Sequence, residues 1–166
     1  MLNVRSKKHR FEAMARLYAD DLFRFAVWLC RDRTLADDLV QETFIRAWKA
    51  IDSLKEIDKA KSWLITILRR EYARTFERKV LRLVDIDDVV DLEPDGDSPD
   101  GLAGRDELRR AIAELDPKYG EPLALQVLMG LSISEIGASL ELSDSAVMTR
   151  VFRARKQLEQ YMQDEL

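Results

Sequence analysis

The chain has 166 residues, of which 46% are hydrophobic and 35% are charged, a composition that excludes a wholly disordered chain and allows one domain or two small ones. Its apolar runs are much shorter than the about 20 residues of a membrane-spanning helix, and no apolar signal core follows its basic start, so we expect neither membrane insertion nor secretion. The single cysteine and single histidine exclude an internal disulfide and disfavour a Cys/His zinc site or a di-iron carboxylate enzyme. We therefore expect a protein of the reducing cytoplasm that holds no metal.

Charge is segregated along the chain, although the net charge is only −4. Residues 1–83 carry 19 basic and 12 acidic residues, a net of +7; residues 84–104 carry eight acidic residues and no basic one; residues 105–166 carry a net of −3. The acidic strip also holds proline and glycine, which is the composition of a linker. The sequence thus predicts an N-terminal domain over 1–83, a flexible acidic linker over 84–104 and a C-terminal domain over 105–166.

Helical periodicity dominates the first domain. Apolar residues recur at spacings of three and four over residues 11–30, in a stripe that includes Leu17. A second helix is expected to start at Thr34, which with Asp37 has capping-box spacing. Its predicted buried stripe is Val40, Phe44, Ala47 and Ile51, with Trp48 beside it. A third helix is expected over residues 62–79, apolar in its first half and basic in its second.

The second domain is also expected to be helical, so the predicted fold class is all-α. A fourth helix should cover about residues 105–115. Asp116 and Pro117 have the cap-then-proline pattern of a helix start, and Gly130 should end that fifth helix. Ser132 and Glu135 are spaced as the capping box of a short sixth helix over 133–140. A tight connection, 141–143, then leads to a last helix over about 144–162.

The last helix is two-faced. Its apolar stripe is Val147, Val151, Ala154 and Leu158, and the opposite face carries Ser145, Thr149, Phe152, Arg153 and Lys156. A short helix, a tight turn and such a helix predict a helix-turn-helix that reads the DNA major groove.

The residue types on that face suit DNA. Ser145 and Thr149 can bond base edges or phosphates, and Arg153 can bond a guanine or a phosphate. Phe152 can lie on a thymine methyl group, while Arg150 and Lys156 can neutralise phosphates. The alternative is a plain helical hairpin with a solvated basic face, but the exposed Phe152 favours DNA binding.

Three stretches of the chain, in order, resemble the extracytoplasmic-function group of bacterial RNA polymerase sigma factors. They are the segment from Asp37 to Trp48 (DDLVQETFIRAW), the segment from Ser62 to Ile67, and the C-terminal helix-turn-helix from Ser132 to Leu158. The resemblance covers about residues 10–80 and 105–160, on either side of the linker.

The resemblance implies partners and roles. Asp38, Gln41 and Glu42 would bind core RNA polymerase, although a solvated face with Glu42 paired to Arg46 is the alternative. Lys59, Lys61 and Ser62 would contact the melted strand of promoter DNA, and Arg70, Arg74 and Arg78 would read the proximal (minus-ten) element. The distal (minus-thirty-five) element would be read by Ser145, Thr149, Arg150, Phe152, Arg153 and Lys156. The linker would either thread the RNA exit path or serve as a solvated tether. The family also implies an anti-sigma factor, a monomeric free protein, and a chain that is not an enzyme and uses no cofactor. The mild overall acidity fits weak promoter binding without polymerase.

The sequence departs from the family pattern at several of these positions. Arg70 and Arg74 stand where the family often has Asn and Asp, and Met148 stands where it often has a basic residue. Ser145–Ala146 replaces a frequent Gly-Thr pair. Promoter preference therefore cannot be copied from relatives. The rival interpretation is a stand-alone, dimeric helix-turn-helix regulator that binds a palindrome.

Overall fold

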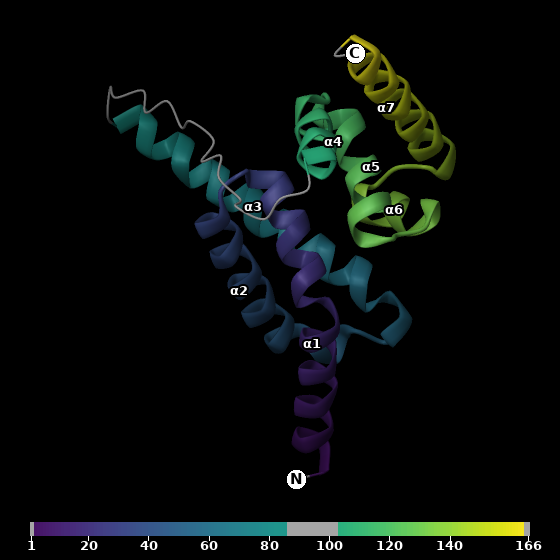
Figure 1. Cartoon of the computed structure of the whole chain (residues 1–166). Helices are drawn as coiled ribbons and strands as arrows, with labels where there is room; N and C mark the ends of the chain where they lie inside the picture. Colours follow the sequence, from purple (N-terminus) through teal and green to yellow (C-terminus); the bar gives the residue numbers. More distant parts are fainter. Residues whose placement is uncertain (1, 86–102, 165–166) are drawn as a thin grey trace. The chain divides into compact units, whose positions relative to one another are not determined.

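The computed structural model describes residues 2–85 and 103–164, and every helix in those ranges belongs to one of two units, Met1–Asp95 and Gly96–Leu166. The helices are α1 (Leu2–Cys30), α2 (Arg33–Ala50), α3 (Ala60–Asp85), α4 (Ala103–Glu114), α5 (Pro117–Met129), α6 (Ile133–Leu140) and α7 (Asp144–Asp164), with two short 3₁₀ turns, η1 (Ile51–Ser53) and η2 (Ile57–Lys59), before α3 (Figure 1). The prediction of an all-α chain is confirmed. The predicted linker lies outside the described residues except at its ends, which belong to α3 and α4.

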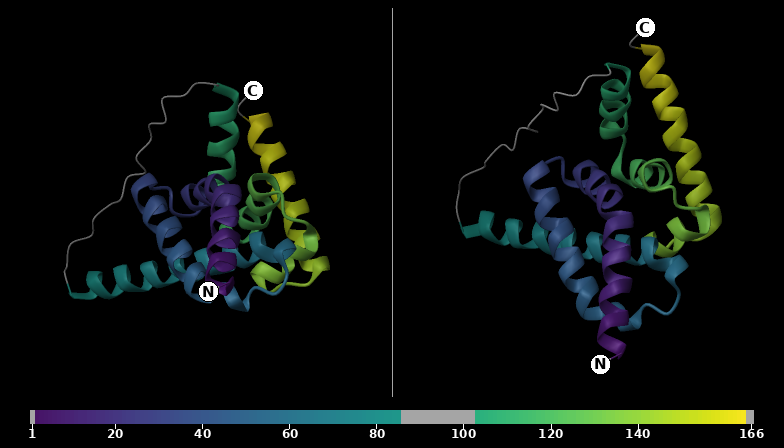
Figure 2. Two further views of the ribbon diagram at one scale, coloured as in Figure 1. Left: turned by 90° about the horizontal axis from the view of Figure 1, so that it is seen from below. Right: turned by 60° about the horizontal axis from the view of Figure 1, so that its bottom comes forward.

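In the first unit α1 and α2 form a helical hairpin (Figure 2). α1 begins at Leu2, nine residues before the predicted start at Phe11. The hairpin turns at Arg31, whose φ is 56°, and Asp32 Oδ1 accepts a 3.0 Å hydrogen bond from the Leu35 amide. Asp32 therefore caps α2, and the prediction that the helix starts at a Thr34–Asp37 box is wrong.

The buried side of α2 agrees with the predicted stripe only in part, because Ala47 and Ile51 are buried whereas Val40 and Phe44 are only partly buried. Its buried residues are Ala36, Leu39, Thr43 and Ala47. Two alanines let α2 approach its neighbours closely, and the buried Thr43 hydroxyl is satisfied by donating to the Leu39 carbonyl at 2.6 Å. The larger Phe44 and Trp48 instead pack edge-on against Phe11 of α1, with ring centroids 6.0 Å and 5.3 Å from its own.

The core of this unit lies where α1, α2 and α3 meet. It includes Leu22 and Phe25 of α1 and Leu64, Ile65 and Leu68 of α3, all fully buried. Leu17 is 66% exposed, so its predicted place in the core stripe is wrong. The last turns of α3 extend beyond α1 and α2 (Figure 2), which leaves Phe76, Val80 and Leu81 exposed.

The helix boundaries of the second unit follow the predicted signals. Asp116 caps α5 and accepts from the Lys118 amide, Pro117 stands in its first turn, and Gly130 ends it with φ 63°. Ser132 and Glu135 form the predicted reciprocal capping box of α6. The core around α5, α6 and α7 includes Leu125, Met129, Ile136 and Val147.

The turn between α6 and α7 is tight. Glu141 ends α6 in the left-handed region, with φ 57°, and the Leu142 amide donates to the Gly137 carbonyl at 2.9 Å. A Cβ added at Gly137 would lie 2.6 Å from the Leu142 carbonyl oxygen. Only glycine therefore fits at position 137 without a backbone shift.

Candidate nucleic-acid interface

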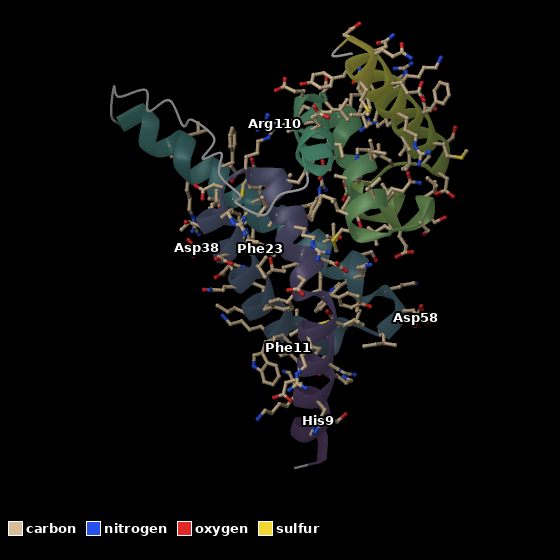
Figure 3. The ribbon with its side chains drawn as sticks, viewed as in Figure 1. His9, Phe11, Phe23, Asp38, Asp58 and Arg110 are labelled. Carbon is tan, nitrogen blue, oxygen red and sulfur yellow. The ribbon has the colours of Figure 1, made fainter. Side chains whose placement is uncertain are left out.

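The acidic face of α2 is exposed where it was predicted to meet a partner. Asp38 projects from α2 near the end of the hairpin opposite to Phe11 (Figure 3). Asp38 and Gln41 are exposed, and Glu42 is half-exposed with its carboxylate 3.2 Å from the Arg46 Nε. The expected competing pair of Glu42 with Arg46 is thus present, while Asp38 and Gln41 remain open to a partner.

A buried carboxylate connects this face to α3. Glu71 has a side chain only 8% exposed, and it contacts the Arg46 guanidinium of α2. Its Oε1 also accepts from Arg74 Nη1 at 2.9 Å. Two arginines from two helices therefore share one buried acid, which offsets the cost of removing that carboxylate from water.

The predicted DNA contacts of α3 fall into two groups. Arg70 and Arg78 are exposed, but Arg74 is held by Glu71. Arg74 is exposed as well, so all three arginines are accessible to solvent.

The residues before α3 that were predicted to contact the melted DNA strand differ in their exposure. Lys59 is 68% exposed and pairs with Glu56 at 3.2 Å. Lys61 is only 23% exposed and pairs with Asp21 of α1 at 3.8 Å. The Ser62 hydroxyl donates to the Lys59 carbonyl at 3.2 Å.

The exposed face of α7 carries all five residues predicted for it: Ser145, Thr149, Phe152, Arg153 and Lys156. The opposite side is buried at Val147, Val151 and Ala154. Phe152 is 58% exposed, and the Lys156 ammonium lies 4.9 Å from its ring centroid. This face presents an aromatic ring, cations and hydroxyl groups to solvent, which are the groups that contact base edges and phosphates.

Two residues that were not predicted from the sequence also border this face. Lys118 and Tyr119, in the first turn of α5, line a hollow together with the N-terminal half of α7. Tyr119 accepts a 3.1 Å hydrogen bond from Arg153 Nη1. The Asp116–Pro117 cap places both residues in the first turn, but no sequence pattern indicates that this turn lies beside α7.

Within residues 2–85 and 103–164, no helix combines the length and apolar character required to cross a bilayer. In the same ranges no group of three or more His, Cys, Asp and Glu side chains is arranged to hold a metal ion.

Comparisons with known proteins identify the family. Residues 14–82 match sigma-70 region 2, and residues 105–158 match sigma-70 region 4. The ECF RNA polymerase sigma factor SigM of Bacillus subtilis is 30% identical over 86% of this chain and 88% of its own. SigX of the same organism, also an ECF RNA polymerase sigma factor, is 28% identical over 92% and 84%.

A solved structure agrees with these relatives. The sigma factor RpoE of Bartonella quintana, crystallised with the anti-sigma factor NepR, has a TM-score of 0.79 and 26% identity, over 92% of this chain and 96% of its own. The chain belongs to the extracytoplasmic-function sigma factors, alternative sigma factors that direct RNA polymerase to specific promoters. These are transcription regulators, and the comparisons give no support to the stand-alone dimeric regulator.

Proposed function

We propose that the two units divide the work of promoter recognition. The first unit binds core RNA polymerase through α2, contacts the melted strand near η2 and reads the proximal element with the second half of α3. The second unit reads the distal element with α7. The main support for this division is the exposed face of α7, where the Phe152 ring is exposed to solvent beside cations and hydroxyl groups.

The polymerase-binding surface is centred on Asp38 and Gln41, with Glu42 at its edge. The Glu42 carboxylate is engaged by Arg46, whereas Asp38 and Gln41 are exposed and open. An exposed carboxylate that pairs with no cation among the described residues is suited to pair with a cation of another protein. Asp38 therefore provides the larger share of the charge attraction to polymerase.

The free protein binds promoters weakly and is monomeric. Its net charge of −4 opposes approach to DNA, since nonspecific affinity derives from the neutralisation of phosphates. Sequence-specific binding then requires core polymerase. An anti-sigma factor is a further partner, because the matched sigma factor structures of RpoE and CnrH were solved with the anti-sigma factor NepR and the cytosolic domain of CnrY.

Run-off transcription on fragmented genomic DNA tests this function. Core RNA polymerase is supplied with and without the protein, and new transcript starts are sequenced. We expect discrete protein-dependent starts that share two upstream elements. The absence of such starts, together with no capture by core polymerase, would contradict the proposal, and a stable dimer in light scattering would favour the regulator that binds a palindrome.

A further inference from the structure

A hollow of about 330 Å³ lies beside the DNA-facing surface of the second unit, between the first turn of α5 and the N-terminal half of α7. Three cations line it: Lys118, Arg150 and Arg153. The Tyr119 phenol, three hydroxyl-bearing residues in and just before the first turns of α7, and Ala146 also line it, and within the described residues no carboxylate contributes to it. Such a set of groups suits an anion rich in acceptor oxygens.

Tyr119 lies close to two of the three cations of this hollow. Its hydroxyl accepts the hydrogen bond from Arg153 Nη1 at 3.1 Å, and the Arg153 guanidinium carbon lies 5.8 Å from the ring centroid. The Lys118 ammonium lies 5.6 Å from the same centroid. The first turn of α5 is fixed by Asp116 Oδ1, which accepts from the Lys118 amide at 2.9 Å. The tyrosine thus holds one cation directly and lies within 6 Å of a second.

The place of the hollow on α7 indicates the source of the anion. At about 100° per residue, Arg153 and Arg150 lie roughly 40° and 100° to one side of Thr149, away from Phe152. A helix about 10–12 Å across fills a major groove about 12 Å wide. When the stripe of Thr149 and Phe152 faces the base edges, the side with Arg150 faces one sugar–phosphate wall of the groove.

We propose that this hollow binds a backbone phosphate of promoter DNA beside the distal element, and that Lys118 and Tyr119 of α5 are part of the DNA interface. Lys118 and Arg150 neutralise the phosphate. Tyr119 donates its hydroxyl proton to a phosphate oxygen while it accepts from Arg153, so it also fixes the guanidinium next to the base edges. The inference rests on the proposed reading of the distal element by α7.

The test uses the polymerase holoenzyme on a promoter found by run-off transcription. We expect Lys118→Ala to weaken promoter binding on the order of tenfold, equally for promoters that differ in distal sequence. The slope of log affinity against log salt concentration should fall by about 0.9, the value for one phosphate contact. Arg110→Ala is the matched control, because Arg110 is an exposed cation of the same unit on α4 (Figure 3), and it should change neither quantity.

Neutral phosphates locate the contact on the DNA. Methylphosphonate linkages are placed one at a time along the distal element, and one position should reproduce the loss caused by Lys118→Ala. At that position, the methylphosphonate and Lys118→Ala together should weaken promoter binding no more than either change alone. Tyr119→Phe should weaken binding without changing the salt slope, because it removes a hydrogen bond but no charge.

Three results would overturn the inference while leaving the sigma factor function intact. The first is unchanged binding by Lys118→Ala on an active promoter. The second is a loss confined to promoters with one particular base pair. The third is that free phosphate, and not DNA, is the ligand of the hollow. In that case inorganic phosphate, exchanged for chloride at constant ionic strength, would weaken promoter binding by the unsubstituted protein but not by Lys118→Ala. No methylphosphonate position in the DNA would then weaken binding. Failure of the proposed function itself would be seen earlier, as the absence of any protein-dependent promoter.

Discussion

Glu71 balances the charge of two arginines where α2 packs against α3. Its carboxylate is buried, and it contacts Arg46 and Arg74, both about half-exposed. Truncating one partner of a buried ion network leaves the remaining charges without compensation, and this costs more than the net contribution of the intact network.

We expect Glu71→Gln to destabilise the first unit by about 2 kcal/mol, because charge-assisted hydrogen bonds become neutral ones. For a unit of this size that loss lowers the melting temperature by roughly 10 °C. Thermal unfolding followed by circular dichroism measures it. Glu42→Gln, at the exposed end of the same network, is the control and should cost less than about 1 kcal/mol. Equal effects of the two substitutions would contradict the role given to Glu71.

Asp38 tests the polymerase-binding surface. Asp38→Arg reverses an exposed charge that forms no ion pair within residues 2–85 and 103–164 as the structure describes them, so we expect it to abolish capture by core polymerase while helicity is retained. A pull-down with purified core enzyme measures capture, and Asp20→Arg, an exposed reversal on α1, is the control. Unchanged capture would remove Asp38 from the proposed surface.

Cys30 gives the first unit a dependence on alkaline pH. Burial raises the pKa of the Cys30 thiol, and this outweighs the effect of its hydrogen bond to the Asp32 carbonyl, which lowers that pKa. The folded state therefore disfavours the thiolate. The stabilisation is fully present below the ordinary thiol pKa of about 8.5 and is lost as the pH rises through the higher pKa of the folded state.

Denaturant unfolding at neutral and alkaline pH checks this effect. We expect the free energy of unfolding to fall more steeply with pH in the unsubstituted protein than in Cys30→Ala. Alkylation of Cys30 should also be slow at neutral pH, since the thiolate is the reactive form. Identical pH profiles of the two proteins would contradict the raised pKa.

At the scale of the element, the turn between α6 and α7 fixes the direction of α7 relative to α6. We expect Gly137→Ala to destabilise the second unit by about 1–3 kcal/mol, because its Cβ would meet the Leu142 carbonyl. Glu141→Gly should instead stabilise it by up to about 1 kcal/mol, because glycine tolerates the left-handed backbone at that position. Thermal unfolding measures both, and effects of the same sign would contradict the geometry described.

The helix ends of the second unit could be predicted from sequence because their signals are local. Asp116, Pro117 and Gly130 act on backbone groups within one turn, and so do Ser132 and Glu135. The start of α2 was mistaken because Thr34 and Asp37 have the same spacing as a capping box, and only the turn at Arg31 selects Asp32. Local spacing alone does not decide between two adjacent caps.

Side-chain partners across helices were less predictable. The outward face of α7 follows from helical periodicity, and the structure agrees. The contacts of Glu71 with Arg46 and of Tyr119 with Arg153 span 25 and 34 residues, and no periodicity encodes them. Lys61 was predicted for DNA by its charge, but its position beside Asp21 depends on how α3 packs on α1.

At the scale of the whole molecule, each unit has a hydrophobic core of its own. Leu22, Phe25 and Leu68 are buried in the first, and Leu125 and Ile136 in the second. Each unit is also within the size range in which single domains fold alone.

We therefore expect the fragments 1–95 and 96–166 to fold separately. Each should give a helical circular dichroism spectrum and a cooperative thermal transition. Only the first fragment should be captured by core polymerase through Asp38. A fragment that remains unfolded on its own would show that its core requires the other unit.

The Glu71 carboxylate, which Arg46 and Arg74 share, has a consequence for the evolution of the protein. Arg74 lies among the residues proposed to set promoter preference, yet its guanidinium is held by the same acid that holds Arg46. An acidic residue at position 74 would place a second carboxylate beside Glu71 with only Arg46 to balance them. We therefore expect positions 46, 71 and 74 to change together, and we expect a chimera that takes α3 from a relative to need the matching residue of α2 as well.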